Sequence, residues 1–525
     1  MAGSGNKLKT VICLLRNDLR YHDNEILKWG HQNADNVIPL YCFDPRHYKG
    51  TWHFEFQKTG PFRLKFLLES VSDLRNTLKQ VGSGLLVRHG EPEVIVPQLI
   101  KQIGLQGDCV AVALQEEVTK EELDVENGLV KSCQPVTVKK FWGSTLYHKQ
   151  DVPFRINNVA NVFTAFRKQV ESQCRVRQVI QMPDKYKPLP PGLDEGVIPS
   201  MADLGVADEV SDSRSAFPFS GGESTGLQRI QHYFWDKNYV AKYKETRNGL
   251  IGSDYSTKFS TWLAHGCLSP RKIYEEVKKY ERQREANQST YWIIFELIWR
   301  DYFKFVAMKF GNKLFYLSGL LGIYKEWNQN KEMFDAWREG RTGVPFVDAN
   351  MREMKATGFM SNRGRQNVAS FLTKDLKLDW RLGAEWFEYL LMDHDVCSNY
   401  GNWLYSAGVG NDPRQDRKFN MIKQGLDYDP QGDYIRLWVP ELSGIKDGGV
   451  HTPWTQSKTV LERADVELGR TYPYPIVQAP EWNRHTGRGG SSKRGRGGRP
   501  EPRGKQRGID FYFSNPSQKR GGDKY

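Results

Sequence analysis

Short apolar runs and longer amphipathic stretches alternate over the first 175 residues. The short runs are rich in β-branched residues, as in strands; they cover 10–15, 37–43, 85–89, 110–115 and 136–141. Helical spacing between them covers 61–81, 93–103 and 120–133. Because helices separate successive strands, we expect a parallel sheet covered on both faces. The pattern therefore predicts a doubly wound α/β domain over residues 1–175.

The rest of the chain has a different pattern. Residues 176–222 have no sustained period, and Pro, Asp, Ser and Gly are frequent from 181 onward, which predicts a long interdomain linker. Residues 223–482 have helical spacing punctuated by Gly and Pro, which predicts an all-α domain. The predicted fold class is thus α/β plus all-α, followed by a tail over 483–525.

Composition excludes several classes of protein. Of the 525 residues, 39% are hydrophobic and 26% charged, which is typical of globular domains. No apolar run is long enough to span a bilayer, and the N-terminal segment resembles neither a secretory signal nor a transit peptide. The seven scattered cysteines include no CxxC pair, so we expect a reducing compartment, the nucleus or cytoplasm, and no metal site.

Positive charge is concentrated at the C-terminal end. Residues 483–525 contain twelve Lys and Arg against three acidic residues, so they carry +9 of the net +13. This Gly- and Arg-rich composition cannot bury enough apolar area to fold. We therefore predict a disordered basic tail, suited to non-specific phosphate binding or nuclear import.

One apolar motif interrupts this tail. Gln506, Ile509, Tyr512 and Phe513 have the spacing of the peptide that docks on DNA sliding clamps. A short helical turn would bring the three apolar side chains to one side, with Gln506 hydrogen-bonding beside them. The motif predicts a sliding clamp as a partner; the alternative is that these aromatic residues bind nothing.

A cluster of hydroxyl groups and one lysine precedes a predicted helix in the C-terminal half. Ser256, Thr257, Lys258 and Ser260 lie within five residues. Side-chain hydroxyls and free backbone N–H groups before a helix suit an anion such as phosphate. Simple N-capping of the helix is the alternative interpretation.

Two further segments place acids beside apolar residues. Glu296 and Trp299 are three residues apart and share a helix face, where a buried acid needs a hydrogen-bond partner. Asp393 and Asp395 follow an apolar run, with two Arg upstream, which suggests one salt bridge and one acid facing a ligand. Paired acids also serve general acid–base catalysis, so a hydrolase competes, although no nucleophile–base arrangement accompanies them.

Together these segments resemble the photolyase/cryptochrome flavoproteins. The matching motifs are Glu-Leu-Ile-Trp-Arg-Asp at 296–301, Thr-Gly-Val-Pro-Phe-Val-Asp at 342–348 and Met-Ser-Asn-Arg-Gly-Arg-Gln at 360–366. The resemblance extends from residue 8 to about 480. Within the family, the segments at 141–147 and 364–367 resemble the DASH-type cryptochromes.

The resemblance implies an FAD in a U-shaped conformation inside the helical domain. Tyr243 and the hydroxyl–lysine cluster would hold its pyrophosphate. Asn362 would face flavin N5, and Arg365 would pair with Asp393. Asp395 would meet the polar edge of the isoalloxazine. The full set of implied FAD contacts is Tyr243, Ser256, Thr257, Lys258, Ser260, Asn362, Arg365, Asp393, Asp395 and Asn399.

In repair members of the family, a reduced flavin excited by blue light passes an electron to a pyrimidine dimer, which splits and returns it. The resemblance implies that Glu296 hydrogen-bonds the dimer and that Trp299 stacks on it, with Asn362 as the third catalytic residue. Three tryptophans match the family's electron relay from the surface to the flavin, namely Trp327, Trp380 and Trp403.

The resemblance also implies an antenna cofactor, methenyltetrahydrofolate, in the N-terminal domain. Glu117 is the best candidate for contacting its pterin, and Phe141 and Trp142 are further candidates.

The lesion pocket departs from that of double-strand photolyases. Gln366 replaces a Met and Tyr405 replaces a second stacking Trp, so the pocket formed with Glu296 and Trp299 is more polar. Such a pocket offsets less of the cost of extruding a dimer from a duplex, a cost that nearly vanishes in single strands. We therefore predict repair of cyclobutane dimers in single-stranded or looped DNA. We also expect a monomer, with RNA as a further ligand. The alternative is a blue-light signalling protein that does not repair.

Overall fold

The computed structural model describes residues 8–105, 107–209 and 212–485. Within these residues, the N-terminal domain contains a five-stranded parallel sheet in the order β3-β2-β1-β4-β5. Each predicted strand is confirmed, and so is the doubly wound arrangement. The strands are β1 (Leu8–Leu15), β2 (Ala34–Phe43), β3 (Leu86–His89), β4 (Val110–Gln115) and β5 (Thr137–Phe141).

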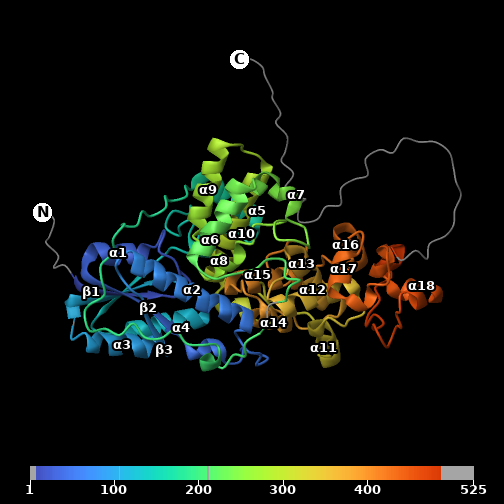
Figure 1. Ribbon diagram of the computed structural model, residues 1–525, viewed down its shortest axis with the longest axis horizontal. Coiled ribbons are helices and arrows are strands. Elements are labelled where there is room, and N and C mark those ends of the chain that lie inside the picture. Colours follow the sequence, from blue (N-terminus) through green and yellow to red (C-terminus); the bar gives the residue numbers. More distant parts are fainter. Residues whose placement is uncertain (1–7, 106, 210–211, 486–525) are drawn as a thin grey trace, which may run out of the picture.

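Helices cover both faces of this sheet (Figure 1). Val11 and Cys13 of β1 pack into the core on the side of α1 and α2, whereas Ile12 and Leu14 pack against α3 and α4. This alternation follows from the two-residue period of a strand. The helices of this domain are α1 (Glu25–Asn33), α2 (Pro61–Gln80), α3 (Pro92–Gln102), α4 (Lys120–Ser132) and α5 (Phe163–Gln173).

The helices α1 and α5 were not among the predicted helical stretches. They have nine and eleven residues, lengths at which isolated helices are marginal and the periodicity is weak. A local signal for α1 does exist, because the Asn24 side chain caps it by accepting a hydrogen bond from Leu27 N at 3.1 Å.

The predicted linker runs along the α/β domain. In its described part, Ala202–Leu204 is a 3₁₀ turn and the rest forms neither helix nor strand. Its backbone is nevertheless held, because Tyr186 N donates to Val81 O at 2.7 Å and Glu195 O accepts from Val87 N at 2.8 Å.

The described chain from Glu223 onward is helical, as predicted. Its helices are α6 (Glu223–Ile230), α7 (Tyr243–Thr246), α8 (Ser260–Ala264), α9 (Pro270–Gln283), α10 (Gln288–Phe310), α11 (Lys331–Glu339), α12 (Pro345–Thr357), α13 (Asn362–Ser370), α14 (Trp380–Leu390), α15 (Val396–Ala407), α16 (Met421–Tyr428), α17 (Asp433–Trp438) and α18 (Lys458–Arg463). The described chain ends in a 3₁₀ turn, Pro480–His485, which overlaps the first three residues of the predicted tail. The rest of the tail, with the clamp motif, lies outside the described residues.

The helix α10 is the central helix around which several others pack. It has 23 residues, is buried along most of its length, and contacts α5, α7, α9 and α15. A helix that is apolar nearly all round must be surrounded by other elements. The Asn287 side chain caps its start, and Gly311, with a φ of +55°, follows its last residue.

Buried polar contacts join the two domains. Asp23 of the α/β domain pairs with Arg271 of α9 at 2.8 Å, and both side chains are almost fully buried. The Asp301 carboxylate of α10 accepts the backbone N–H groups of Leu146 and Tyr147 at 2.9 and 2.8 Å. These contacts fix α10 relative to the sheet.

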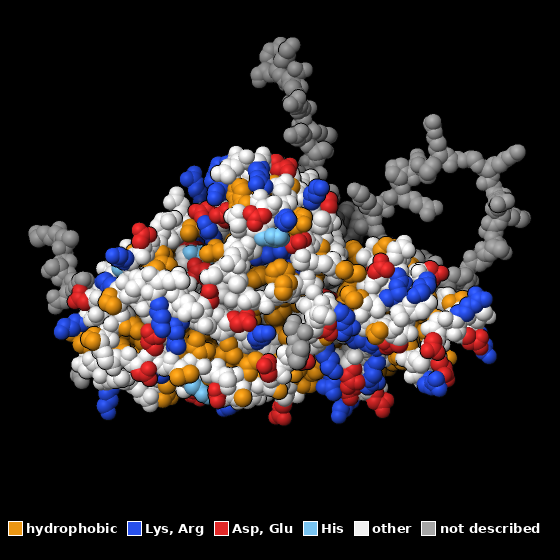
Figure 2. Space-filling view, viewed as in Figure 1, with side chains coloured by type: hydrophobic (Ala, Val, Ile, Leu, Met, Phe, Trp, Pro, Cys, Tyr) orange, Lys and Arg blue, Asp and Glu red, His pale blue; other side chains and the backbone are white. Residues whose placement is uncertain are grey.

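Three further observations concern the molecule as a whole. In the described ranges, no helix combines the length and apolar character that crossing a bilayer requires, and no group of His, Cys, Asp and Glu is arranged to hold a metal ion. All seven cysteines are free thiols. Charged side chains of both signs intermingle around α11, at the lower right of the face in Figure 2, and hydrophobic side chains are exposed nearer its centre.

Candidate cofactor pocket and light-reaction site

Lys258 lies in the loop that leads into α8, within the segment predicted to bind an anion. Its φ of +63° is in the left-handed region, which a non-glycine residue rarely adopts. The side chain is 3% exposed, and its Nζ has no hydrogen-bond partner among the described residues. Burial lowers the Lys258 pKa well below its usual value. A buried cation without such a partner marks a site for an anionic group.

Arg229 of α6 holds this loop, although the sequence analysis did not single it out. Its Nε donates to Thr257 O and its Nη2 to Ser256 O, both at 3.0 Å, and its Nη1 pairs with Asp254 at 2.7 Å. Thr257 is buried, whereas Ser260 is exposed in the first turn of α8. The strained loop is therefore stabilised by one buried guanidinium.

The predicted pair of Arg365 and Asp393 is present beside Lys258. Arg365 Nη2 and Asp393 Oδ2 are 2.9 Å apart. The Arg365 guanidinium and the Lys258 ammonium both lie over the Phe359 ring, at 5.7 and 4.6 Å from its centroid. The second carboxylate oxygen of Asp393 is buried without a hydrogen-bond partner among the described residues. Residues from α13, the 391–395 loop and the loop before α8 thus lie around the Phe359 ring, and we call this cluster the candidate cofactor pocket.

A buried acid that was not predicted completes this pocket. Glu353 of α12 is 1% exposed and accepts a hydrogen bond from the Tyr434 hydroxyl at 2.5 Å. Burial raises the pKa of Glu353 to about 7, against the opposing effects of Tyr434, Lys258 and Arg365. In the sequence Glu353 looks like an ordinary helical glutamate, so only the tertiary structure could identify it.

Three more predicted cofactor residues lie near the starts of helices. Asp395 caps α15 by accepting from Ser398 N at 2.7 Å. Burial alone would raise the Asp395 pKa, but nearby cations and this capping bond hold it below the usual value. Asn399 Nδ2 donates to Ala384 O at 2.9 Å, and Asn362 is exposed as the first residue of α13. The assignment of Asn362 to flavin N5 stays a prediction.

Glu296 lies on the partly exposed face of α10 that it shares with Trp299. One carboxylate oxygen accepts the Tyr243 hydroxyl, and the other accepts Arg247 Nε at 2.7 Å. Tyr243, expected at the pyrophosphate, therefore contacts Glu296 directly. The partner that a half-buried acid requires is Arg247, a residue that the sequence analysis did not single out.

A chain of hydrogen bonds connects Glu296 to Gln366. Arg247 Nη1 donates to Asn248 Oδ1 at 3.4 Å, and Arg363 Nε donates to the same oxygen at 2.9 Å. Arg363 Nη1 then donates to Gln366 Oε1 at 3.1 Å. Two residues predicted for the lesion pocket are thus joined through two guanidinium groups and one amide.

The aromatic residues of the predicted lesion pocket also lie together. The rings of Trp299 and Tyr405 are 6.1 Å apart and nearly perpendicular, at 88°. Phe163 of α5 stacks on Trp299 with a centroid distance of 3.6 Å and an angle of 8°, so one ring face of Trp299 is covered. Trp299 thus lies beside Tyr405 and shares the face of α10 with Glu296, which the hydrogen-bonded chain links to Gln366.

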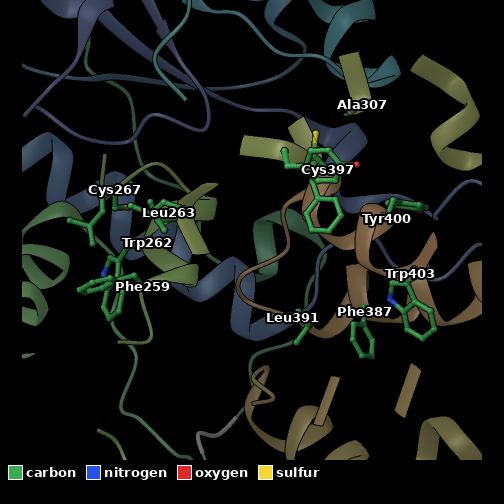
Figure 3. Packing of buried hydrophobic residues seen from close by; sticks show 14 of the residues in the cluster. Phe259, Trp262, Leu263, Cys267, Ala307, Phe387, Leu391, Cys397, Tyr400 and Trp403 are labelled. Atoms are coloured by element: carbon green, nitrogen blue, oxygen red, sulfur yellow. The ribbon is translucent and has the colours of Figure 1, made fainter. Parts of the chain in front are cut away.

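The three predicted relay tryptophans differ in burial. Trp403 and Trp380 are 2% and 0% exposed, whereas Trp327 is half-buried. Trp403 packs against Phe387 at 5.0 Å, and Figure 3 shows these rings side by side. A Cβ on Gly383 would lie 2.1 Å from the Trp403 ring, so this glycine allows α14 and α15 to approach closely. Two of the three tryptophans are thus buried and the third, Trp327, is partly exposed.

The residues predicted for the antenna lie at the carboxyl edge of the sheet. Glu117 follows β4, beside the point where the strand order reverses between β1 and β4, which is where open α/β sheets bind ligands. Glu117 is 4% exposed, and its carboxylate pairs with Lys304 of α10. Phe141 packs on Trp29 at 5.5 Å, and Trp142 Nε1 donates to a nearby hydroxyl. At Glu117, this edge of the sheet is covered by Lys304 of the helical domain.

Comparisons with known proteins agree with this architecture. Residues 11–190 match the family described as DNA photolyase, and residues 292–488 match the FAD binding domain of DNA photolyase. A cryptochrome DASH of Xenopus laevis is 64% identical over 96% of this chain and 98% of its own. A cryptochrome DASH of Gloeobacter violaceus is 53% identical over 89% and 93% of the two chains.

Solved structures show the same fold. A crystal structure of a Synechocystis cryptochrome superposes with a TM-score of 0.87 and 48% identity, covering 91% of this chain and 98% of the other. A class III photolyase of Agrobacterium tumefaciens superposes with a TM-score of 0.77 and 27% identity, covering 93% and 98%.

The pocket fits the FAD that the family domain implies. Two of its buried polar atoms lack a hydrogen-bond partner among the described residues. The Lys258 ammonium suits a pyrophosphate, and the Asp393 carboxylate oxygen can accept a hydrogen bond from the edge of a ring. The sequence analysis assigned Lys258 to the pyrophosphate and Asp395 to the polar edge of the isoalloxazine, and it expected Asp393 to pair with Arg365. With its α/β domain, its helical FAD-binding domain and its relatives over nearly its full length, the chain belongs to the photolyase/cryptochrome family, as a cryptochrome of the DASH type.

Proposed function

We propose that this protein uses FAD and blue light to split cyclobutane pyrimidine dimers in single-stranded or looped DNA. The observation that carries the proposal is the hydrogen-bonded chain from Glu296 to Gln366, which lies on the same side of α10 as Trp299. When bound, reduced FAD supplies one electron to the dimer under blue light and takes it back. The residues of the chain bind and orient the lesion.

Glu296 is the group proposed to bind the dimer. Tyr243 and Arg247 hold the two carboxylate oxygens, so the carboxylate is oriented before a ligand arrives. Each oxygen keeps a free lone pair that can accept a pyrimidine N–H. Trp299 is partly exposed beside Tyr405, so part of its ring remains available to contact the base.

The polarity of the pocket supports the preference for single strands. Gln366 is held by Arg363, and Tyr405 presents a phenol in place of a second indole. Such a surface gains less from an apolar dimer than a fully aromatic pocket does. The few kcal/mol needed to extrude a base from a duplex are therefore not offset here, whereas a single strand does not incur that cost.

We further propose that three tryptophans pass electrons to the cofactor under light, namely Trp327, Trp380 and Trp403. Trp380 and Trp403 are buried and Trp327 is partly exposed, so Trp327 is the member of the proposed relay that an external reductant can reach. Trp380 and Gly383 share a face of α14, and Trp403 packs on Gly383, so the two inner tryptophans lie on adjoining helices. This path would supply electrons to the cofactor under light.

An antenna folate at the carboxyl edge of the sheet is a further part of the proposal. Trp142 and Phe141 offer aromatic surface, but Glu117 can bind a pterin only if Lys304 releases or shares its carboxylate. Fluorescence of the purified protein in the folate band checks occupancy. A Glu117→Gln variant that retains the full folate signal would contradict the role given to Glu117.

The first experiment compares blue light with darkness, using reduced protein with dimer-containing single-stranded and duplex oligonucleotides. We expect light-dependent repair of the single strand and little repair of the duplex. Glu296→Gln should lower repair at least tenfold while FAD binding and photoreduction persist. The matched control is Glu332→Gln, an exposed glutamate of α11 that should leave repair unchanged.

Each result has a defined meaning. Equal repair of both substrates would retain the repair function and reject the argument from pocket polarity. No repair of either, with FAD bound and photoreducible, would favour the alternative of a blue-light signalling protein. The same oligonucleotides as RNA test whether the lesion site also accepts ribose.

We further propose that the tail motif at Gln506, Ile509, Tyr512 and Phe513 binds a DNA sliding clamp. A peptide covering 503–518 should bind a clamp in calorimetry, and replacing Tyr512 and Phe513 with Ala should abolish binding. No heat and no competition with a known clamp peptide would reject the motif.

Two further proposals concern the location of the protein, which the basic tail influences, and its oligomeric state. We propose nuclear and cytoplasmic residence, tested by fluorescent tagging of the full chain against a truncation at residue 485. We propose a monomer, which light scattering would show as a mass near 60.6 kDa.

A further inference from the structure

Tyr400 of α15 lies in the core beside the relay tryptophans. It is 4% exposed, and its ring contacts Trp380 edge-to-face at 6.2 Å and 85°. Phe315 packs against it at 4.8 Å. Figure 3 shows Tyr400 and Trp403 on the same helix. An oxidisable phenol thus touches the middle of the proposed electron path.

The Tyr400 hydroxyl donates to Glu388 Oε2 at 3.2 Å. Glu388 lies on α14, eight residues after Trp380, so the two side chains share one face of that helix, two turns apart. One helix therefore presents both an indole and a carboxylate to the same phenol. This arrangement suits coupled loss of an electron and a proton, because the two can leave in different directions.

Other buried tyrosines lack this combination. Tyr243, Tyr434 and Tyr472 also donate to carboxylates. Among the described residues, however, none of these three rings contacts Trp327, Trp380 or Trp403 in the manner of Tyr400. Among these four tyrosines of the described chain, Tyr400 alone combines a relay contact with a proton acceptor.

We propose that Tyr400 and Glu388 form a proton-coupled redox site that branches from Trp380, an inference that rests on the proposed relay. One electron passes from Tyr400 to the Trp380 radical cation. The phenolic O–H bond breaks, and its proton forms a new O–H bond on Glu388. The products are neutral Trp380, a neutral Tyr400 radical and a protonated Glu388, so charge and atoms balance. The positive hole is thereby trapped away from the cofactor.

The surroundings of Glu388 suit a proton acceptor. Burial raises its pKa to about 7; Arg63 of α2 and Lys58 oppose this, and Glu121 of α4 and Glu385 of α14 add to it. The carboxylate is therefore ionised in mildly alkaline solution and protonated in mildly acidic solution. A base whose pKa lies near the working pH accepts and returns a proton readily.

The test uses the full chain with oxidised FAD and without DNA, excited by a blue flash. Time-resolved electron paramagnetic resonance and transient absorption distinguish tyrosyl from tryptophanyl radicals. We expect a tyrosyl signal in the wild type that forms more slowly in D₂O. Tyr400→Phe and Glu388→Gln should each remove it and shorten the lifetime of the charge-separated state at least tenfold.

Tyr280→Phe is the matched control. Tyr280 is also buried and donates its hydroxyl, but to the Asn238 side chain, and its ring contacts are with Phe234 and Trp235. Loss of this hydroxyl should change neither the identity nor the lifetime of the radicals. An equal loss of signal in this variant would overturn the assignment to Tyr400.

The outcomes separate the inference from the relay beneath it. Flavin photoreduction with tryptophanyl radicals alone in the wild type would overturn the role of Tyr400 and leave the relay intact. Unchanged photoreduction in Trp380→Phe would reject the relay itself. If the Tyr400 variant fails to fold, the wild type still decides, because the tyrosyl yield should fall as the pH drops through about 7. A constant yield from pH 8 to 6 would overturn the inference.

Discussion

At the residue scale, the cofactor pocket depends on groups that are unfavourable in the protein alone. Lys258 is buried without a hydrogen-bond partner among the described residues and adopts a left-handed backbone conformation. Replacing a buried polar group that lacks a hydrogen-bond partner with an apolar side chain of similar volume commonly stabilises a protein. We expect Lys258→Met to raise the stability of the FAD-free protein by ~1–3 kcal/mol and to weaken FAD binding by roughly 10- to 100-fold.

Thermal unfolding of the FAD-free protein and flavin titration check these two effects. The control is Lys331→Met, an exposed lysine at the start of α11. A Lys258→Met variant that loses stability without FAD, or that binds FAD as tightly as the wild type, would contradict the interpretation.

Glu353 gives the pocket a pH dependence. Its pKa is raised from 4.5 to about 7, so the folded state holds a proton between these values that the unfolded state has released. Stability therefore falls as pH rises through this window, by up to ~1.4 kcal/mol per pH unit. Glu353→Gln keeps an acceptor for Tyr434 and should remove this fall. Denaturant unfolding of both proteins at pH 5 and pH 7 measures the difference; identical pH profiles would refute the buried-acid argument.

At the element scale, close helix contacts position the tryptophans. Gly383 lets α14 approach α15 until a Cβ would lie 2.1 Å from the Trp403 ring. We expect Gly383→Ala to destabilise the protein by ~1–3 kcal/mol through overpacking and to slow photoreduction by displacing Trp403. The control is Gly128→Ala in α4, where the nearest atom would be Glu93 Cβ at 3.3 Å. The free energy of unfolding and the photoreduction rate are measured for both variants. Equal changes in Gly383→Ala and Gly128→Ala would contradict a specific role for the contact between Gly383 and Trp403.

At the scale of the whole molecule, α10 connects the chemistry to the domain interface. One side bears Glu296 and Trp299, and another inserts Lys304 beside Glu117 in the α/β domain. Burial alone would lower the Lys304 pKa, but Glu117 raises it above the usual value, so the Lys304 ammonium keeps its proton. The two domains are thus joined by a buried ion pair only 7% and 4% exposed.

Breaking this pair should be costly, whereas replacing both partners should not be. Lys304→Met leaves a buried carboxylate unpaired, and we expect it to destabilise the protein by ~3–5 kcal/mol. Adding Glu117→Gln should restore most of that loss. A double-mutant cycle in urea measures the coupling, and additive effects would show that the pair contributes no specific interaction.

The elements that the sequence predicted best are those with a strong period. The five strands and the helix at 120–133 follow from alternating or 3.6-residue spacing, which local geometry imposes whatever the partners are. The short helices α1 and α5 were missed because nine to eleven residues give a weak period. Residues recognised by motif, such as Arg365 and Asp393, were paired correctly because the motif preserves contacts between distant segments.

The sequence by itself therefore determined the fold class, the order of the α/β and helical parts, and the family, and it proposed most residues of the candidate site. The tertiary structure alone decided which distant charges meet. Arg229, Arg247 and Glu353 look like surface residues of helices or loops, and become parts of the site only when the chain folds. The tertiary structure likewise decided that Lys304 forms an ion pair with Glu117 and that Glu388 accepts a hydrogen bond from Tyr400. The physical reason is that helix and strand patterns are local, whereas burial and the pairing of charges depend on packing between segments far apart in the sequence.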